Sequence, residues 1–112
     1  METSVNNFLA SQHKLKLTHV EDPITVMESG MSGMIFTLDD IDEKFFDLKN
    51  GILGETFQKF VNYRFPVAIV LPADHGFGLR VTELAREHAR HDVVRFCKTM
   101  EEAKAWMIKV LG

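Results

Sequence analysis

The segment Phe65–Leu71 is an almost unbroken run of apolar side chains, and it constrains the fold of this chain more than any other feature. Side chains alternate between the two faces of a β-strand, so a continuously apolar strand is buried on both faces. Strands of this kind lie inside parallel sheets that helices cover on both sides. The run therefore predicts a central strand of an α/β domain.

Two shorter runs flank this strand in the sequence and have the composition of strands: Gly33–Leu38 before it and Val93–Cys97 after it. Between each pair of runs, mostly apolar residues recur every three or four positions, which is the spacing of one face of a helix. They are Leu53, Phe57, Phe60, Val61 and Arg64 in the first interval, and Phe77, Val81, Leu84, Ala85 and His88 in the second. The alternation predicts two β-α-β units with parallel strands.

Both ends of the chain add elements. Thr99 stands three residues before Glu102, the spacing at which side chains satisfy the free amides of a helix start, so a helix is expected there. Pro23 opens a short helix, and His13–Val20 alternates apolar and polar residues like a strand. Met1–Gln12 is rich in polar residues and is expected to be a loosely held arm.

The composition limits the function classes. A chain of 112 residues, 46% of them hydrophobic, is expected to form one domain, 1–112, with its own core. Thirteen basic against sixteen acidic residues leave a net charge of −3, too weak a field to hold a nucleic-acid backbone or an anionic membrane. Neither a membrane span nor a signal-peptide pattern is visible. We expect a cytoplasmic protein with no nucleic-acid partner and no membrane partner.

The single cysteine, Cys97, lies within an apolar run. A free cysteine in such a place is expected to be a buried thiol, because burial in apolar surroundings raises its pKa and makes it inert. The residue therefore fits a reducing compartment and argues against nucleophilic catalysis.

The segment Phe45–Arg64, which reads Phe-Phe-Asp-Leu-Lys-Asn-Gly-Ile-Leu-Gly-Glu-Thr-Phe-Gln-Lys-Phe-Val-Asn-Tyr-Arg, closely resembles the bacterial family catalogued as domain of unknown function 4180. The likeness continues at Ala68–Val70, Glu83–Glu87 and Glu101–Ala103 with Trp106, about the final two-thirds of the chain. The resemblance implies a fold similar to the STAS or SpoIIAA-like group, whose best-known members are regulatory binding proteins. The expected structure is thus a single-domain α/β sandwich, with a sheet of four to five mostly parallel strands and three to four helices.

Ligands of an open parallel sheet bind beyond the carboxyl ends of the strands, where loops and helix starts gather. Asp74, His75, Gly76 and Gly78 follow the central run and precede a helix, so they are candidates for an anion site or an acid–base pair. The chain departs from the family pattern here, because relatives tend to show Gly-Asp-Phe after this strand. The plainer interpretation, which we favour, is that Asp74 caps the helix while His75 is solvated.

Asp39 and Asp40 follow another strand and, together with Asp74, have the oxygens that a divalent cation needs. Asp40, however, stands three residues before Glu43, which is a helix-start spacing, and capping is the favoured interpretation. His88 and His91 are three apart on a helix, like a metal-binding pair, but no other Cys or His supplies further ligands. A half-buried His88 and an exposed His91 are favoured, and we expect no metal and no cofactor.

Phe46 lies in the stretch 45–49, where no regular helix or strand would bury all the apolar side chains and expose all the charged ones. An irregular turn is therefore expected. With Lys49, Tyr63 and Arg64 it would form an exposed aromatic patch rimmed by charge, suited to a protein partner or a small anionic ligand. Alternatively, Phe46 fills a gap in the core, while Gly51 and Gly54 allow close helix-to-sheet packing. The sequence favours neither interpretation.

Two functions of different classes follow. The leading hypothesis is a non-enzymatic regulatory or binding module that acts through protein contacts or a small ligand at the strand-end edge. The alternative is a small hydrolase or isomerase that uses Asp74 and His75 as an acid–base pair, which requires both groups to reach one concave pocket. A homodimer is plausible for so small a domain, although no residue pattern demands one.

Overall fold

The computed structural model describes residues 7–111. Its sheet consists of β1 (Met34–Phe36), β2 (Val67–Val70) and β3 (Val94–Cys97), in the order β1-β2-β3 and with both pairings parallel. β2 lies in the middle and pairs Val67 with Met34 on one side and with Val94 on the other. All four residues of β2 are buried, so the central strand expected from its apolar run is confirmed.

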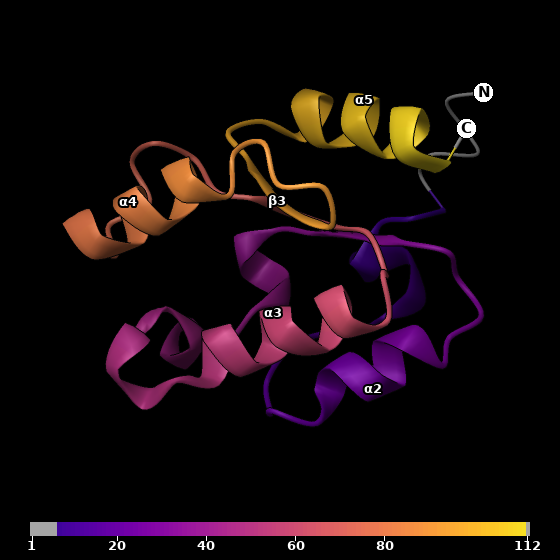
Figure 1. The fold of residues 1–112 in the computed structure, drawn as a ribbon, viewed down its shortest axis with the longest axis horizontal. Coiled ribbons are helices and arrows are strands. Elements are labelled where there is room, and N and C mark those ends of the chain that lie inside the picture. Colours follow the sequence, from indigo (N-terminus) through magenta and orange to yellow (C-terminus); the bar gives the residue numbers. More distant parts are fainter. Residues whose placement is uncertain (1–6, 112) are drawn as a thin grey trace.

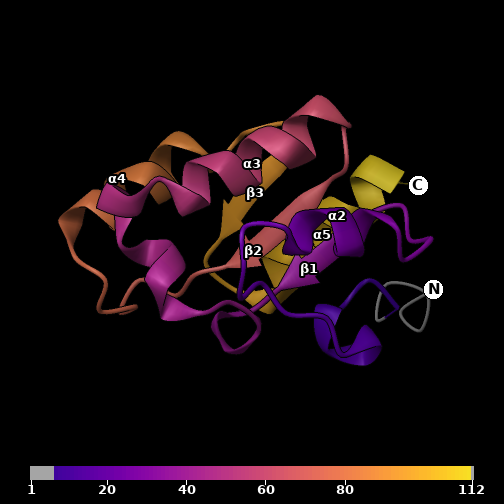
Figure 2. The same cartoon turned by 90° about the horizontal axis from the view of Figure 1, so that it is seen from below.

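Helices cover both faces of this sheet, as expected for an α/β domain. On one face lie α2 (Asp22–Met27), α3 (Ile52–Asn62) and α4 (Leu79–Glu87), and α5 (Met100–Leu111) covers the opposite face. Figure 1 shows α5 above the strands, with α3 and α2 below them. Figure 2 looks from the side of α2 and α3 towards the three strands, with α5 behind.

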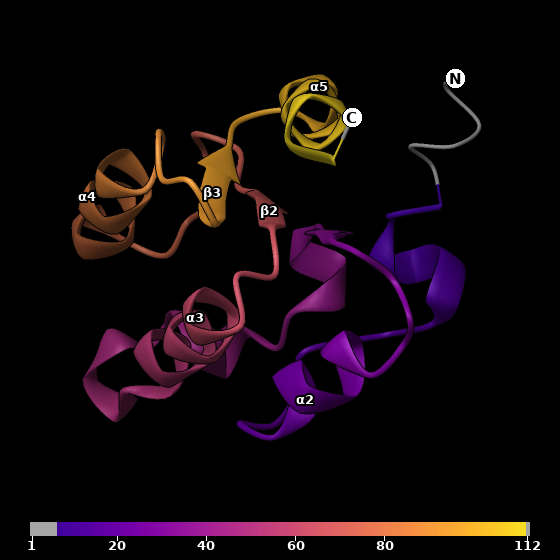
Figure 3. The ribbon, with the colours of Figure 1, turned by 45° about the vertical axis from the view of Figure 1, so that its right-hand side comes forward.

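The alternation of side chains along each strand divides the core in two. Ile69 and Phe96 point into the larger core, where each covering helix contributes a residue that is only 1% exposed: Val26, Phe60 and Val81. Full burial of one such side chain stabilises the fold by about 1.5 to 3 kcal/mol. The strand residues that point to the opposite face form the smaller core with Ala103, Trp106 and Met107 of α5. These strand residues are Ile35, Ala68, Val70 and Cys97. Figure 3 shows α5 and α3 on opposite sides of β2.

The start of α5 confirms the helix expected near Thr99, with one difference. Thr99 Oγ1 accepts a hydrogen bond from the Glu102 amide at 3.2 Å, as a capping residue does. The Glu102 carboxylate, however, accepts from the amide of Lys98 at 3.1 Å and not from that of Thr99. The reciprocal bond is thus shifted by one residue, which brings this carboxylate back over the end of β3.

The expectation of a loosely held arm over 1–12 is wrong for the described part, 7–12. Leu9 forms a parallel bridge with Ile35, and the amide of Ile35 donates to the Phe8 carbonyl at 2.6 Å. Ala10, the first residue of a 3₁₀ turn, is fully buried. The polar composition suggested a solvated segment, but three apolar residues, Phe8 to Ala10, pack it onto β1. Residues 1–6 lie outside the described part.

Three strands among residues 7–111 are fewer than the four to five expected. The difference comes from His13–Val20, whose alternating pattern predicts a strand. Leu17 from this segment is fully buried, but it makes only an isolated bridge with Ile41. Alternation therefore reported the burial of Leu17 correctly, whereas the neighbouring turns leave too little extended chain for a strand.

Candidate ligand-binding site

A hollow of about 400 Å³ opens beyond the carboxyl ends of β2 and β3. The chain leaves β2 towards α4 on one face of the sheet, and it leaves β3 towards α5 on the other face. Where adjacent parallel strands send their connections to opposite faces, a crevice forms between the two loops, and ligands of α/β proteins bind there. The hollow occupies this position in the fold.

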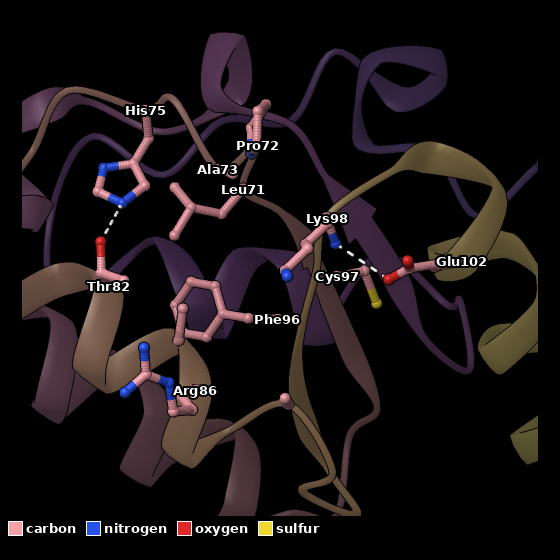
Figure 4. Close-up of a pocket in the computed structure, with 12 residues that line it drawn as sticks. Leu71, Pro72, Ala73, His75, Thr82, Arg86, Phe96, Cys97, Lys98 and Glu102 are labelled. Carbon is pink, nitrogen blue, oxygen red and sulfur yellow. Dashed lines mark hydrogen bonds between the residues drawn. The ribbon is translucent and has the colours of Figure 1, made fainter.

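The floor and one wall of the hollow are apolar. The contributing residues come from the segment after β2, from β3, from α4 and from the turn after α4, and they are Leu71, Pro72, Ala73, Ala85, Ala89, Phe96 and Cys97. The polar contributors are His75, Thr82, Arg86, Lys98 and Glu102. Figure 4 shows His75 and Thr82 on one side of the hollow and Lys98 with Glu102 on the other, with the Phe96 ring between them. An apolar cavity with a few polar groups is the usual form of a small-molecule site.

His75 is held by hydrogen bonds on both ring nitrogens. Its Nδ1 accepts from the Phe77 amide at 2.9 Å, which requires a neutral ring with the proton on Nε2. Nε2 then donates to Thr82 Oγ1 at 2.9 Å, and that hydroxyl donates to the Gly78 carbonyl at 3.3 Å. Neither ring nitrogen is left to exchange a proton with a substrate. His75 therefore fixes the loop onto α4, and the sequence-based view of it as solvated is wrong.

Two cations line the hollow: Arg86 of α4 and Lys98, which directly follows β3. Both side chains are exposed. Among residues 7–111 the structure records one ion pair, between His19 and Asp22, so neither cation is paired with an acidic side chain. The one carboxylate on the hollow, that of Glu102, is engaged by the Lys98 amide. The positively charged donors of Arg86 and Lys98 thus outnumber the one acidic side chain among the lining residues.

Cys97 borders the hollow but is not reactive. Burial raises the pKa of its thiol to about 11, and the nearby Glu102 carboxylate adds to the increase while Arg95 opposes it. A thiol with so high a pKa is protonated at neutral pH and is a poor nucleophile. The expectation of a buried, inert cysteine is confirmed.

Of the strand-end residues expected to bind a ligand, the hollow includes His75 and not Asp74, Gly76 or Gly78. Asp74 is exposed and does not cap α4, which begins after Gly78 without a side-chain cap. Gly76 and Gly78 have φ angles of 80° and 95°, so their role is to turn the chain. Asp74 and His75 do not share the pocket that an acid–base pair requires.

Asp39 and Asp40 also lie away from the hollow, and their roles differ. The Asp40 carboxylate is buried and accepts from the Thr37 amide at 2.8 Å and from Thr37 Oγ1 at 3.0 Å, which closes the cap of a short 3₁₀ turn. Asp42 caps the next turn through the Lys44 amide at 2.9 Å. Capping explains the roles of Asp40 and Asp42. The partner of Asp40 is Thr37, three residues before it, and not Glu43, three residues after it, as its spacing had suggested.

The aromatic patch expected around Phe46 is not present as such. Phe46 is 5% exposed and its ring stacks on that of Phe77 at 4.4 Å between centroids, so it fills the core. The irregular turn expected there is confirmed as two short 3₁₀ segments, Glu43–Phe46 and Leu48–Asn50. Lys49, Tyr63 and Arg64 are exposed, Tyr63 by 74%, and their role as a contact surface stays a prediction.

The explanation offered for Gly51 and Gly54 is wrong. A Cβ atom at either position would meet nothing within 4 Å, so neither glycine permits close packing. Gly51 has a φ of 74°, a left-handed conformation that glycine adopts without strain, and it directly precedes α3. The close approach is made instead at Gly33, where a Cβ would lie 2.9 Å from Met107 Sδ and 3.0 Å from the Pro66 carbonyl oxygen.

His88 and His91 form hydrogen bonds through their Nδ1 atoms with the backbone of β3 and of Val93, the residue before it. His88 Nδ1 donates to the Val94 carbonyl at 3.2 Å, and His91 Nδ1 accepts from the amides of Val93 and Val94 at 3.1 Å each. Both rings are half-buried, although an exposed His91 was expected. No group of three or more His, Cys, Asp or Glu side chains within residues 7–111 is arranged to hold a metal ion.

Sequence reasoning missed Thr82, Arg86, Lys98 and Glu102 as polar members of the hollow. Thr82 and Arg86 stand four positions apart on one face of α4, and Ala89 follows three positions later in the turn after the helix. That spacing was a usable signal, but only with the knowledge that this face overlooks the end of β3. Within the described part of the chain, no helix has the length and apolar character needed to cross a membrane.

Comparisons with known proteins define the family and leave the activity open. No curated protein and no solved structure matches this chain. The model of the family described as "Domain of unknown function (DUF4180)" matches residues 6–107, which is most of the sequence. The chain therefore belongs to the DUF4180 family.

Proposed function

We propose that this protein is a non-enzymatic binding module that holds a small organic anion, a carboxylate attached to an apolar body, in the hollow between α4 and α5. The observation that carries the proposal is the combination of unpaired Arg86 and Lys98 with an apolar floor at the crevice beyond β2 and β3. A planar guanidinium matches a carboxylate through paired hydrogen bonds, and the ammonium adds a second positive charge.

The polar side chains that line the hollow favour an anionic ligand over a neutral or cationic one. His75 and Thr82 satisfy each other, and Glu102 is engaged by backbone. A cationic ligand would meet two cations, Arg86 and Lys98, against the single carboxylate of Glu102. The remaining donors are best satisfied by oxygens with negative charge.

The walls support a carboxylate with an apolar body over inorganic phosphate. Phosphate sites in α/β proteins use a glycine-rich loop whose backbone amides converge on the anion. The glycines after β2, Gly76 and Gly78, do not line the hollow, and the Phe77 amide between them is already bonded to His75. Leu71 and Phe96 instead offer apolar surface, which releases water when a hydrocarbon body covers it.

The proposal is tested with benzoate as the probe, by following the backbone amide signals of the ¹⁵N-labelled protein in NMR. We expect progressive shifts confined to Thr82, Arg86, Phe96 and Lys98, with a Kd on the order of 1 mM, as suits a fragment of this size. Inorganic phosphate at equal ionic strength is the control and should cause smaller shifts at these amides. Shifts spread over Lys49 and Arg64, or absent at 20-fold the expected Kd (about 20 mM), would contradict the proposal.

Two finer statements belong to the same proposal. We propose that the fold is of the STAS or SpoIIAA-like type, which the resemblance of Phe45–Arg64 supports. We also propose that Lys49, Tyr63 and Arg64 contact a protein partner, and the 74% exposure of the Tyr63 side chain supports this. Large aromatic side chains with arginine nearby are typical of protein interfaces.

A further inference from the structure

β3 is an edge strand, and the end of α4 closes its free side. The carbonyls of Val93 and Cys97 face β2, since they accept from the amides of Val67 and Leu71. The groups of Val94 and Phe96 therefore face outwards. An open strand edge invites pairing with other chains, and proteins commonly cover it with another element.

His88 and His91 provide this cover with their backbone and with their rings. The Phe96 amide donates to the His88 carbonyl at 3.3 Å, and the His88 ring donates from Nδ1 to the Val94 carbonyl at 3.2 Å. The His91 ring accepts through Nδ1 from the amides of Val93 and Val94. The outward N–H and C=O of Val94 and the outward N–H of Phe96 are thus satisfied by one short segment after α4.

The two rings differ in how they respond to a proton. A carbonyl only accepts, so His88 Nδ1 carries hydrogen and its bond to Val94 survives protonation. His91 Nδ1 accepts two hydrogen bonds and must keep its lone pair, so protonation there removes both. The rings also stack at 4.8 Å between centroids, which places any positive charge on one beside the other.

We propose that His91 is an acid-sensitive latch: its neutral ring helps to hold the end of α4 against the free edge of β3, and its protonation releases the Val93 and Val94 amides.

The charged groups around His91 favour the neutral, closed state. Arg95 of β3 donates from Nε to the His91 carbonyl at 3.0 Å, while Arg64 after α3 and Arg90 line the same hollow as His91. Asp92 is the acidic neighbour in that hollow, and the α3 residues bordering it, Val61 and Asn62, are uncharged. Gln58 of α3, which lines a second hollow together with His91, is also uncharged.

The direction of the pKa shift agrees with this geometry. Burial, followed by the neighbouring His88, holds the pKa of His91 below the ordinary 6.5, with Asp92 opposing and Arg95 contributing. The unfolded chain therefore binds the proton more readily than the folded one. The stability contributed by the neutral ring is complete above pH 6.5, and it declines as the pH falls from 6.5 through the lower pKa of the folded state.

Amide hydrogen exchange measured by NMR at about pH 7.5 and about pH 5 tests the latch, with rates corrected for the intrinsic effect of pH. In the native chain, we expect protection of the Val93 and Val94 amides to fall by about tenfold or more at low pH, while Ile69 in β2 stays protected. His91→Asn is the matched variant, because its Oδ1 replaces Nδ1 as acceptor and does not titrate. It should keep edge protection at both pH values.

Three results would overturn the proposal: equal loss of protection in the native chain and His91→Asn, loss at Ile69 in parallel, or no loss at all. A second measurement needs no variant. The ¹⁵N shifts of the His91 ring should show an unprotonated Nδ1 at neutral pH and should titrate together with the edge amides. A ring that carries hydrogen on Nδ1 at neutral pH would refute the latch even if His91→Asn fails to fold.

Discussion

Asp39 and Asp40 are adjacent and chemically identical, but burial gives them different structural roles. Asp40 is 5% exposed and accepts two hydrogen bonds from Thr37, whereas Asp39 is exposed. The sequence indicated capping in this stretch because acidic residues precede a turn. It did not indicate which carboxylate is buried, since that depends on how the chain bends after β1.

Replacement of these two aspartates by alanine distinguishes capping from a shared ligand role. Asp40→Ala leaves the Thr37 amide and hydroxyl without their partner, so we expect a loss of about 1 to 2 kcal/mol in the free energy of unfolding. Asp39→Ala, the matched control, should change it by less than about 0.5 kcal/mol. Urea unfolding measures both values. Equal losses for the two variants would contradict the capping assignment.

At the scale of elements, α3 contains a glycine that its packing does not need. Gly54 lies inside Ile52–Asn62, and a Cβ there would meet nothing within 4 Å. Glycine in a helix interior costs about 1 kcal/mol relative to alanine. Gly33, which precedes β1, is the opposite case, because Met107 and Pro66 occupy the space that a Cβ would take.

The two glycines therefore respond to alanine with opposite signs. Gly54→Ala should stabilise the protein by about 0.5 to 1 kcal/mol, because it restricts the unfolded chain and favours the helix. Gly33→Ala should destabilise it by about 1 to 3 kcal/mol, since α5 must move away from the sheet. Thermal unfolding of both variants beside the native chain measures the signs. A destabilised Gly54→Ala would show that open space at this point of α3 matters.

At the scale of the whole molecule, the parts that sequence predicted are those whose burial leaves a periodic pattern. β2 is buried on both faces and α3 on one, so Phe65–Leu71 and the spacing from Leu53 revealed them. The contacts of Leu9 and Leu17 were not predicted, because each residue pairs through a single bridge with a distant residue, Ile35 and Ile41 respectively. Short segments of that kind carry no repeat that reports their partner.

The residues that line the hollow could not be predicted from the sequence, for a related reason. Arg86 and Lys98 are ordinary surface cations in the sequence, twelve positions apart. Their proximity to one hollow follows from α4 and α5 lying on opposite faces of the sheet, and no local pattern encodes that arrangement. The position of the site beyond the strand ends was predictable from the parallel sheet. Its residues were not, except for His75.

The central claim is that Arg86 and Lys98 together hold an organic carboxylate, and charge-matched double variants test it most directly. The measurement is the Kd of benzoate for the native chain, for Arg86→Gln with Lys98→Gln, and for Arg64→Gln with Lys49→Gln. The second pair removes the same charge from the exposed surface away from the hollow. We predict that the first pair weakens binding by about tenfold or more, and the second by less than about twofold. Equal weakening by both pairs, or none by the first, would contradict the account.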